Sequence, residues 1–492
     1  MRQLALFSLL LGSVLVLPAA RAQSLGSVDF PTSTASADAQ AAFERGLLLL
    51  HSFEYDDARD AFRAAHQIDP AFALAAWGEA MTHNRPIWMQ QDRAEGQRAL
   101  ARVDGDLDGI TDRERGYLRT ARVLFGGEGD KEARDDAYER AMAELAAAYP
   151  DDLDAQALWA LAILGTAHEG RDFAVYMRAA AVLEGVFARN PEHPGAAHYL
   201  IHAYDDAVHA PLGLRPARVY ADVAPDASHA LHMPSHIYLA LGLWDETADL
   251  NRRSFEAARA NSERRGEPLN NHGWHALYWL NYAALQQGDL EGAFGTLGLA
   301  RRLAGDDPSV LARTHLVRIR AHMLAETGRF DDASLRFEVD LDGASATTRA
   351  IELASRVSLA GTDAAARRAP LDALRALADA PDASPTVRAI RLVQDALLAD
   401  AEGDLGAAEA HLREAAALVE AEPLTFGPPT PALPPHEMLG LWLAKNDRTD
   451  EASEAFATQL ALTPGRPLSA QFLARIANAS RTEFEGARAE HP

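Results

Sequence analysis

The feature that most constrains the fold is a repeat of about 34 residues. Its first clear copy places a small residue at Gly46, twelve positions before Ala58, and then has Phe62, Ala65 and Pro70. Small residues let two antiparallel helices approach, a large ring fills the gap between them, and proline or glycine ends each helix. Each helical hairpin would expose an apolar face unless the next one covered it. The pattern therefore predicts a stack of hairpins.

Similar copies follow along the chain. Two are clear, with Leu280, Gly288, Ala293, Leu297 and Ala300, and with Leu439, Gly440, Ala452, Phe456 and Pro464; two are weaker, with Gly328, Ala333 and Phe337, and with Gly403, Ala408, Leu412 and Ala415. These copies resemble tetratricopeptide (TPR) repeats, and the resemblance implies an all-α, TPR-like solenoid of stacked antiparallel hairpins. Residues 101–152 and 341–386 fit the pattern poorly.

The first 22 residues are set apart from the repeats. A positive start and an apolar run from Leu4 to Ala19 precede Ala20-Arg21-Ala22. This order is typical of a secretory signal peptide, although the run is near the minimum length for a membrane anchor. We expect cleavage after Ala22, export to the periplasm or beyond it, and no stable membrane insertion of the mature chain.

We divide the mature chain into three parts. Residues 23–38 are polar and lack helical periodicity, so we expect a flexible leader. Residues 39–340 form the expected N-terminal TPR-like solenoid, and residues 341–492 form the expected C-terminal TPR-like repeats. Six prolines between 423 and 435 predict an extended loop within this last part.

Composition limits the classes of partner. The 492 residues contain no cysteine, which excludes both a disulfide framework and thiolate metal ligands. The formal net charge is -24, and nucleic acid is therefore not an expected partner, because binding it requires a clustered positive face.

Histidines concentrate in one part of the chain. Of the 18 histidines, nine fall between residues 193 and 275, where an even spread would place about three. His198, His202 and Asp205 follow a spacing of i, i+4 and i+7, and His229, His232 and His236 follow i, i+3 and i+7. Each set must lie along one face of its helix.

The repeat register assigns a direction to these faces. If one hairpin begins at Pro194 and the next near Ser228, the two sets occupy early positions of first helices, and His275 occupies the second position of the following repeat. In TPR proteins such positions line the concave groove. The resemblance thus implies that six histidines and Asp205 point into one cleft. The repeat register near Pro234 is fixed only to within one residue, because a proline inside the expected helix would bend it.

Neutral imidazoles with a carboxylate favour a transition metal ion such as Zn, Cu or Fe. The predicted metal ligands are His198, His202, Asp205, His229, His232, His236 and His275. Asp205 or its neighbour Asp206 can instead orient a ring from behind. Two other interpretations stay open, namely contact with a peptide or small ligand and structural packing.

Two segments carry a narrower resemblance. Residues 197–206, AHYLIHAYDD, and 229–238, HALHMPSHIY, resemble those of a group of exported bacterial TPR-domain proteins, from about Phe43 to Gln287. That resemblance implies no activity. Three hypotheses follow: an exported binding protein with a metal site and a protein or peptide partner in its groove, a metal-dependent hydrolase or oxidoreductase, and a metal-free peptide-binding scaffold.

Overall fold

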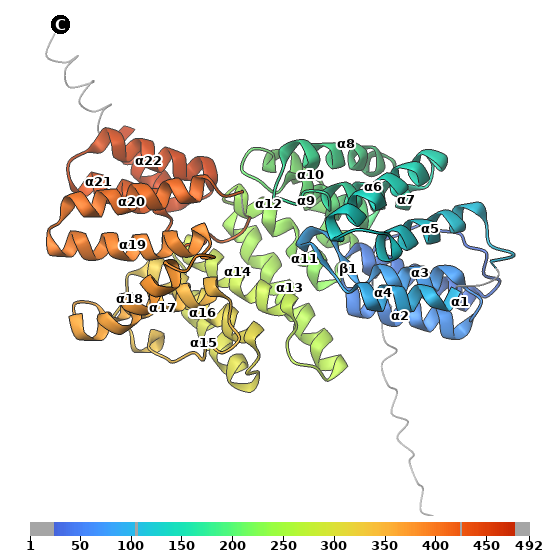
Figure 1. Ribbon diagram of the computed structural model, residues 1–492, viewed down its shortest axis with the longest axis horizontal. Helices are drawn as coiled ribbons and strands as arrows, with labels where there is room; N and C mark the ends of the chain where they lie inside the picture. Colours follow the sequence, from blue (N-terminus) through green and yellow to red (C-terminus); the bar gives the residue numbers. More distant parts are fainter. Residues whose placement is uncertain (1–23, 104–106, 424–425, 478–492) are drawn as a thin grey trace, which may run out of the picture.

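The computed structural model describes residues 24–103, 107–423 and 426–477, and its architecture is an all-α solenoid of stacked antiparallel hairpins (Figure 1). The helices are α1 (Ala37–His51), α2 (Tyr55–Ile68), α3 (Ala73–Met81), α4 (Arg93–Leu100), α5 (Asp112–Gly126), α6 (Lys131–Ala148), α7 (Leu153–Leu164), α8 (Phe173–Arg189), α9 (Pro194–Tyr204), α10 (Ala210–Val223), α11 (Ser228–His232), α12 (Pro234–Ala240), α13 (Trp244–Arg265), α14 (Asn271–Gln287), α15 (Leu290–Asp306), α16 (Val310–Thr327), α17 (Ala346–Ala360), α18 (Ala364–Ala378), α19 (Pro385–Glu402), α20 (Leu405–Glu420), α21 (Pro435–Lys445) and α22 (Thr449–Leu462).

The remaining regular elements are short. They are the 3-10 turns η1 (Pro86–Trp88), η2 (Ala101–Val103) and η3 (Ala333–Leu335), and an antiparallel pair of strands, β1 (Asn84–Arg85) and β2 (Gln90–Gln91). Figure 1 shows the N-terminal hairpins at one end of the long axis, the C-terminal hairpins at the other, and α11 to α14 between them. Among the described residues, no helix is both long and apolar enough to cross a membrane.

Glycine and phenylalanine markers of the repeat pack as the sequence predicts. A Cβ added to Gly46 of α1 would lie 2.8 Å from the ring of Phe62 in α2, and one added to Gly440 of α21 would lie 2.9 Å from Phe456 in α22. Any larger residue at these glycines would push the two helices of a hairpin apart. The fold class predicted from the sequence is therefore confirmed.

One predicted helix is absent. The weak copy at Gly328 implied a second helix through Ala333 and Phe337, but only the turn η3 forms there, and irregular chain leads to α17. Phe337 instead lies under the guanidinium groups of Arg301 and Arg320, 4.7 Å and 4.5 Å from its ring centre. The sequence that follows, EVDLDGAS, is rich in residues that favour turns over helix.

The expected flexible leader is packed onto the fold. Phe30 is fully buried, with its ring centre 5.2 Å from that of Phe43 and 5.1 Å from that of Tyr117. The backbone N–H of Ser33 donates to Glu114, 2.8 Å away. The average polarity of the segment, on which the leader prediction was based, takes no account of this one large apolar anchor. The predicted signal peptide, 1–22, lies outside the described residues.

Buried side chains form consecutive cores along the stack. The first runs from Leu25 to Leu250, the second from Leu239 to Ile390, and smaller ones follow within the C-terminal hairpins. The second core has members on both sides of the division that we place between residues 340 and 341, among them Val339 and Ala350, and that division stays a prediction. The junction of the first two cores, around α12 to α14, is where the histidines gather.

Candidate metal centre

The clustered histidines lie on four helices near the middle of the stack. Prolines at the first turns of α9 and α12 begin two of these helices, because a proline there gives up an N–H that has no helical partner. Pro234 interrupts the helix between α11 and α12 at Met233, whose backbone stays helical with φ of -56° and ψ of -40°. His232 and His236 nevertheless stay together, with their Nε2 atoms 2.9 Å apart.

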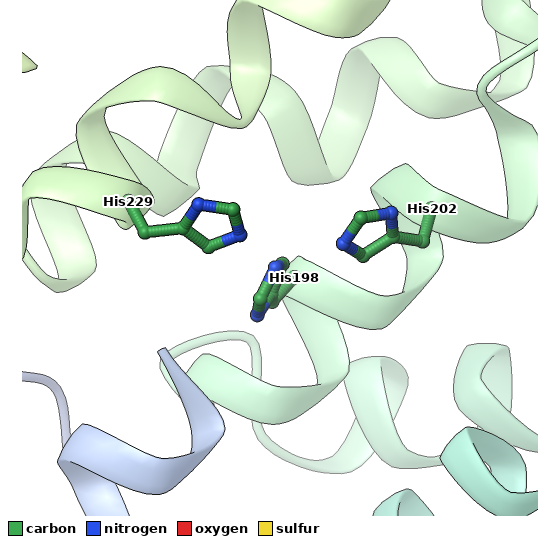
Figure 2. Close-up of side chains that lie close together, drawn as sticks. All are labelled: His198, His202 and His229. Atoms are coloured by element: carbon green, nitrogen blue, oxygen red, sulfur yellow. The ribbon is translucent and has the colours of Figure 1, made fainter. Parts of the chain in front are cut away.

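Three of the rings form a group that we call the first triad: His198 and His202 from α9, and His229 from α11. One ring nitrogen from each lies within 4.8 Å of the others, and Figure 2 shows the rings turned toward a common space. All three residues are buried. Their Nε2 atoms have no hydrogen-bond partner within the described part of the chain.

The remaining three rings form the second triad: His232 from α11, His236 from α12 and His275 from α14. One nitrogen from each again lies within 4.8 Å of the others. His232 and His236 are buried, whereas His275 is half-buried. The structure therefore divides the six predicted histidines into two groups of three. They meet inside the stack, and not on one open groove as predicted.

Hydrogen bonds hold several of these rings from behind. His198 donates from Nδ1 to the backbone carbonyl of His51 over 2.6 Å, which leaves its Nε2 as an unprotonated acceptor in the neutral ring. His236 donates from Nδ1 to Asp205 over 2.6 Å. Asp205 thus lies behind His236 and outside both triads, in the orienting role that the sequence left open. A carboxylate or carbonyl in this position is the usual partner of a metal-binding imidazole.

Burial favours the neutral form of five of the six rings by lowering their pKa. It lowers the pKa of His198 to about 3. Burial, followed by repulsion from neighbouring rings, also lowers the pKa of His202, His229 and His232 well below the usual histidine value, and it does the same for His275. A neutral imidazole with a free nitrogen is the form that binds metal ions. The neutral state here does not depend on a metal.

The sequence did not predict a third group of buried polar side chains. His51 at the end of α1 donates from Nε2 to Asp154 over 2.9 Å, and Nε2 of His193 lies 3.4 Å from the same carboxylate oxygen. The hydroxyl of Tyr199 donates a hydrogen bond to Nδ1 of His51, 3.0 Å away. His51 is thus hydrogen-bonded at both ring nitrogens, whereas Nε2 of His193 makes no hydrogen bond within the described residues. His193 fell in the dense window, but His51 and Asp154 come from distant repeats and carried no spacing signal.

Phe53 covers the first triad. Its ring centre lies 4.4 Å from that of His198, 5.6 Å from that of His229 and 5.8 Å from that of His202. The backbone of Phe53 has φ of 55°, in the left-handed region that a large residue rarely adopts. Strain of this kind often accompanies a functional site. Nothing in the sequence marks this phenylalanine, because its role depends on the turn after α1.

A pocket of about 350 Å³ adjoins the first triad and includes Phe53, Glu54, Trp88 and His272 in its lining. The ring of His272 stacks on that of His229 with 4.9 Å between their centres. Glu54 is buried and accepts hydrogen bonds from the hydroxyl of Ser228 and the backbone N–H of His229. Burial opposes its ionisation, but His272 and these donors lower the pKa of Glu54.

Comparison with known proteins gives similarity of fold only. No protein-family model matches the chain, and no curated protein sequence does. Among solved structures it is similar to yeast Tom70, with 14% identity, 92% of this chain and 90% of that chain covered, and a TM-score of 0.38. Human IFIT1, as a dimer with m7Gppp-AAAA, has 14% identity, coverage of 87% and 91%, and a TM-score of 0.37. The APC/C hetero-tetramer Cut9–Hcn1 has 12% identity, coverage of 89% and 76%, and a TM-score of 0.35. TM-scores of this size carry no argument about function.

Proposed function

We propose that this chain is an exported solenoid protein that binds a transition metal ion, Zn, Cu or Fe, through His198, His202 and His229. One observation carries the proposal: three buried rings each place a nitrogen within 4.8 Å of the others, and the Nε2 atom of each ring has no hydrogen-bond partner within the described residues. A buried polar atom without a partner costs about 1–3 kcal/mol. Three such atoms together are therefore expected only where something else completes them.

The size of the space supports an ion. Nitrogens bound to a tetrahedral ion at roughly 2.0–2.1 Å lie about 3.4 Å apart. The nitrogens of the first triad lie within 4.8 Å of one another. Small rotations of the rings are sufficient to close this difference. The donor set contains no carboxylate and no thiolate, which favours Zn, Cu or Fe over Mg or Ca.

Elemental analysis of the mature protein tests the proposal. We expect a stoichiometric transition metal after purification without chelator, or after reloading with Zn²⁺. The variant His202→Leu should lose metal bound at the first triad, whereas His272→Gln, which changes a neighbouring ring outside both triads, should retain it. A chain that takes up no metal under either condition would refute the metal site and leave the metal-free peptide-binding scaffold.

Export and partner binding complete the proposal. The N-terminal sequence pattern supports cleavage after Ala22, so intact mass of the protein recovered outside the cytoplasm should correspond to a chain that begins at Gln23. Stacked hairpins offer a long surface of the kind that solenoids use for protein or peptide partners. Recovery of an uncleaved chain from the membrane fraction would favour the anchor instead.

The pocket beside the first triad favours a second candidate, a metal-dependent hydrolase or oxidoreductase. Three protein nitrogens leave at least one coordination position open, which is the arrangement of catalytic metal sites. The pocket that contains Glu54 and His272 has a volume of about 350 Å³, enough for a small polar substrate. Turnover of a substrate panel by the metal-loaded chain, lost in Glu54→Gln with metal retained, would establish this function.

A further inference from the structure

The second triad contains an arrangement of hydrogen bonds that is unfavourable without an additional group. His232 Nδ1 lies 2.7 Å from Oδ1 of Asn251. The amide nitrogen of Asn251 donates to the backbone carbonyl of Thr247 over 2.8 Å, which fixes the amide orientation. Oδ1 must therefore accept, and the proton of the neutral His232 ring must be on Nδ1.

The facing ring is fixed in the same way. His236 donates from Nδ1 to the carboxylate of Asp205, so its neutral ring also lacks a proton on Nε2. The Nε2 atoms of His232 and His236 then point two lone pairs at each other across 2.9 Å. Two neutral rings repel in this arrangement, and either a proton on Nε2 of His236 or a metal ion between the two nitrogens relieves the repulsion. Two nitrogens at roughly 2.0–2.1 Å from one ion, at a right angle, lie about 2.9 Å apart.

The two triads also share an edge. Within the first triad, the ring centres of His202 and His229 are 6.3 Å apart. Across the triads, His202 is 6.3 Å from His236, and His229 is 6.2 Å from His232. The separation between the groups thus matches the longest of the three separations inside the first triad, the other two being 4.9 Å. Ions in adjacent sites of this kind can lie roughly 3.5–4 Å apart and share a ligand.

We propose that the two triads form one paired site, which holds two transition metal ions bridged by a small oxygen ligand such as water or hydroxide. This inference rests on the proposed function of the first triad. His275 supplies the third nitrogen of the second ion. The His51–Asp154–His193 group is not counted as an ion site, because both ring nitrogens of His51 are already hydrogen-bonded, to Tyr199 and to Asp154. The expected stoichiometry is two ions per chain.

Loading the full mature chain with Cu²⁺ tests the pairing. Elemental analysis should give two coppers per chain, while quantitative EPR should detect well under two spins, because ions that share a bridging oxygen couple magnetically. His202→Leu and His275→Leu should each reduce the copper content about twofold and restore one full spin per copper. The rings of His202 and His275 make no hydrogen bonds within the described part of the chain, so these substitutions least disturb the fold.

Each outcome has one meaning. Two coppers with two full spins would overturn the pairing, because the ions would be independent. One copper that is retained in His275→Leu and lost in His202→Leu would overturn the second ion and leave the proposed function intact. No copper would overturn both. If His275→Leu loses its helical signal, His275→Asn replaces it, and the wild-type stoichiometry and spin count decide the matter without a variant.

Discussion

Two buried polar regions of this solenoid, the histidine-rich junction and the ion pairs of the C-terminal half, are partnered in different ways. In the C-terminal half, the fully buried Arg320 pairs with Glu352 and donates to the carbonyl of Phe337, and the buried Arg466 contacts Glu437, Glu326 and Tyr282. These networks join opposite charges, although Nε of Arg320 itself makes no hydrogen bond within the described residues. In the N-terminal half and at its junction with α14, neutral imidazoles are held from behind, and several of their inward nitrogens remain without partners.

The difference separates architecture from binding. A complete ion-pair network fixes how helices pack and offers nothing to a ligand. A group of oriented but unpartnered acceptors contributes little to packing and is ready for a cation. The same solenoid thus uses buried polarity for structure at one end and, as we propose, for metal binding near its centre. The predictions below test this contrast.

Breaking the buried C-terminal ion pair should have the largest effect. Arg320→Met leaves Glu352 paired only with the half-exposed Arg356, and we expect a loss of about 3–5 kcal/mol in the free energy of unfolding. Urea unfolding measures it. The double variant Arg320→Met/Glu352→Leu should recover most of the loss, because it removes both charges. Equal stability of the single variant and the wild type would show that the pair is not structural.

Metal binding should have the next largest effect on the free energy of unfolding. The proposed function assigns this effect to the first triad, and the paired site assigns it to both triads. At a free Zn²⁺ concentration of 100 times Kd, the free energy of unfolding should rise by about 2.7 kcal/mol. In chelator, His202→Leu should stay within about 1 kcal/mol of the wild type, because replacing an unpartnered polar group by an apolar one is nearly neutral. Urea unfolding with and without Zn²⁺ measures both. A large loss for His202→Leu in chelator would place this ring among the structural groups and undo the contrast.

Neutral burial of histidine also predicts an acid dependence in chelator. Burial lowers the pKa of His322 to about 3, against roughly 6.5 in an unfolded chain. Between these values the unfolded state binds more protons than the folded state, so stability falls as pH falls, by roughly 1.4 kcal/mol per pH unit for one such ring. His322→Gln, which keeps an acceptor for the Tyr278 hydroxyl, should reduce the slope between pH 6 and 4 by about that amount. An unchanged slope would mean that the ring is protonated in the fold.

The fold was largely predictable because its determinants are local. Gly46 and Phe62 reveal the packing of a hairpin through their spacing alone, and Thr111 and Glu114, three residues apart, form a capping box at the start of α5. Exceptions arose where one residue outweighed an average. Phe30 anchors a polar segment through its buried ring. Phe337 lies outside any helix and packs its ring against the guanidinium groups of two arginines.

The candidate site was predictable in composition and not in arrangement. Helical spacing brought His198 next to His202, and stacking brought His229 beside them. The division into two triads could not be read from the sequence, because it depends on the break at Met233 and on the position of Asn251 behind His232. Asp205 was found, but only the structure shows that it faces a ring.

The smallest predicted effect concerns the turn that places Phe53 on the first triad. In the junction and C-terminal helices the equivalent helix ends are closed by glycines such as Gly288 and Gly403, with φ of 76° and 82°. At the end of α1, Phe53 adopts φ of 55° in the same kind of turn, with the N–H of Glu54 bonded to the carbonyl of Leu49. A residue with a Cβ pays about 1 kcal/mol or more there.

Phe53→Gly and Phe53→Ala both remove the ring that covers His198, so their difference isolates the backbone. We expect the glycine variant to be more stable by about 1 kcal/mol in urea unfolding, the reverse of the usual order in regular structure. The two variants should differ from the wild type in Zn²⁺ affinity by the same factor, because both lose the same contacts. An alanine variant as stable as the glycine variant would show that the turn relaxes, and that Phe53 is not held over the triad against a backbone preference.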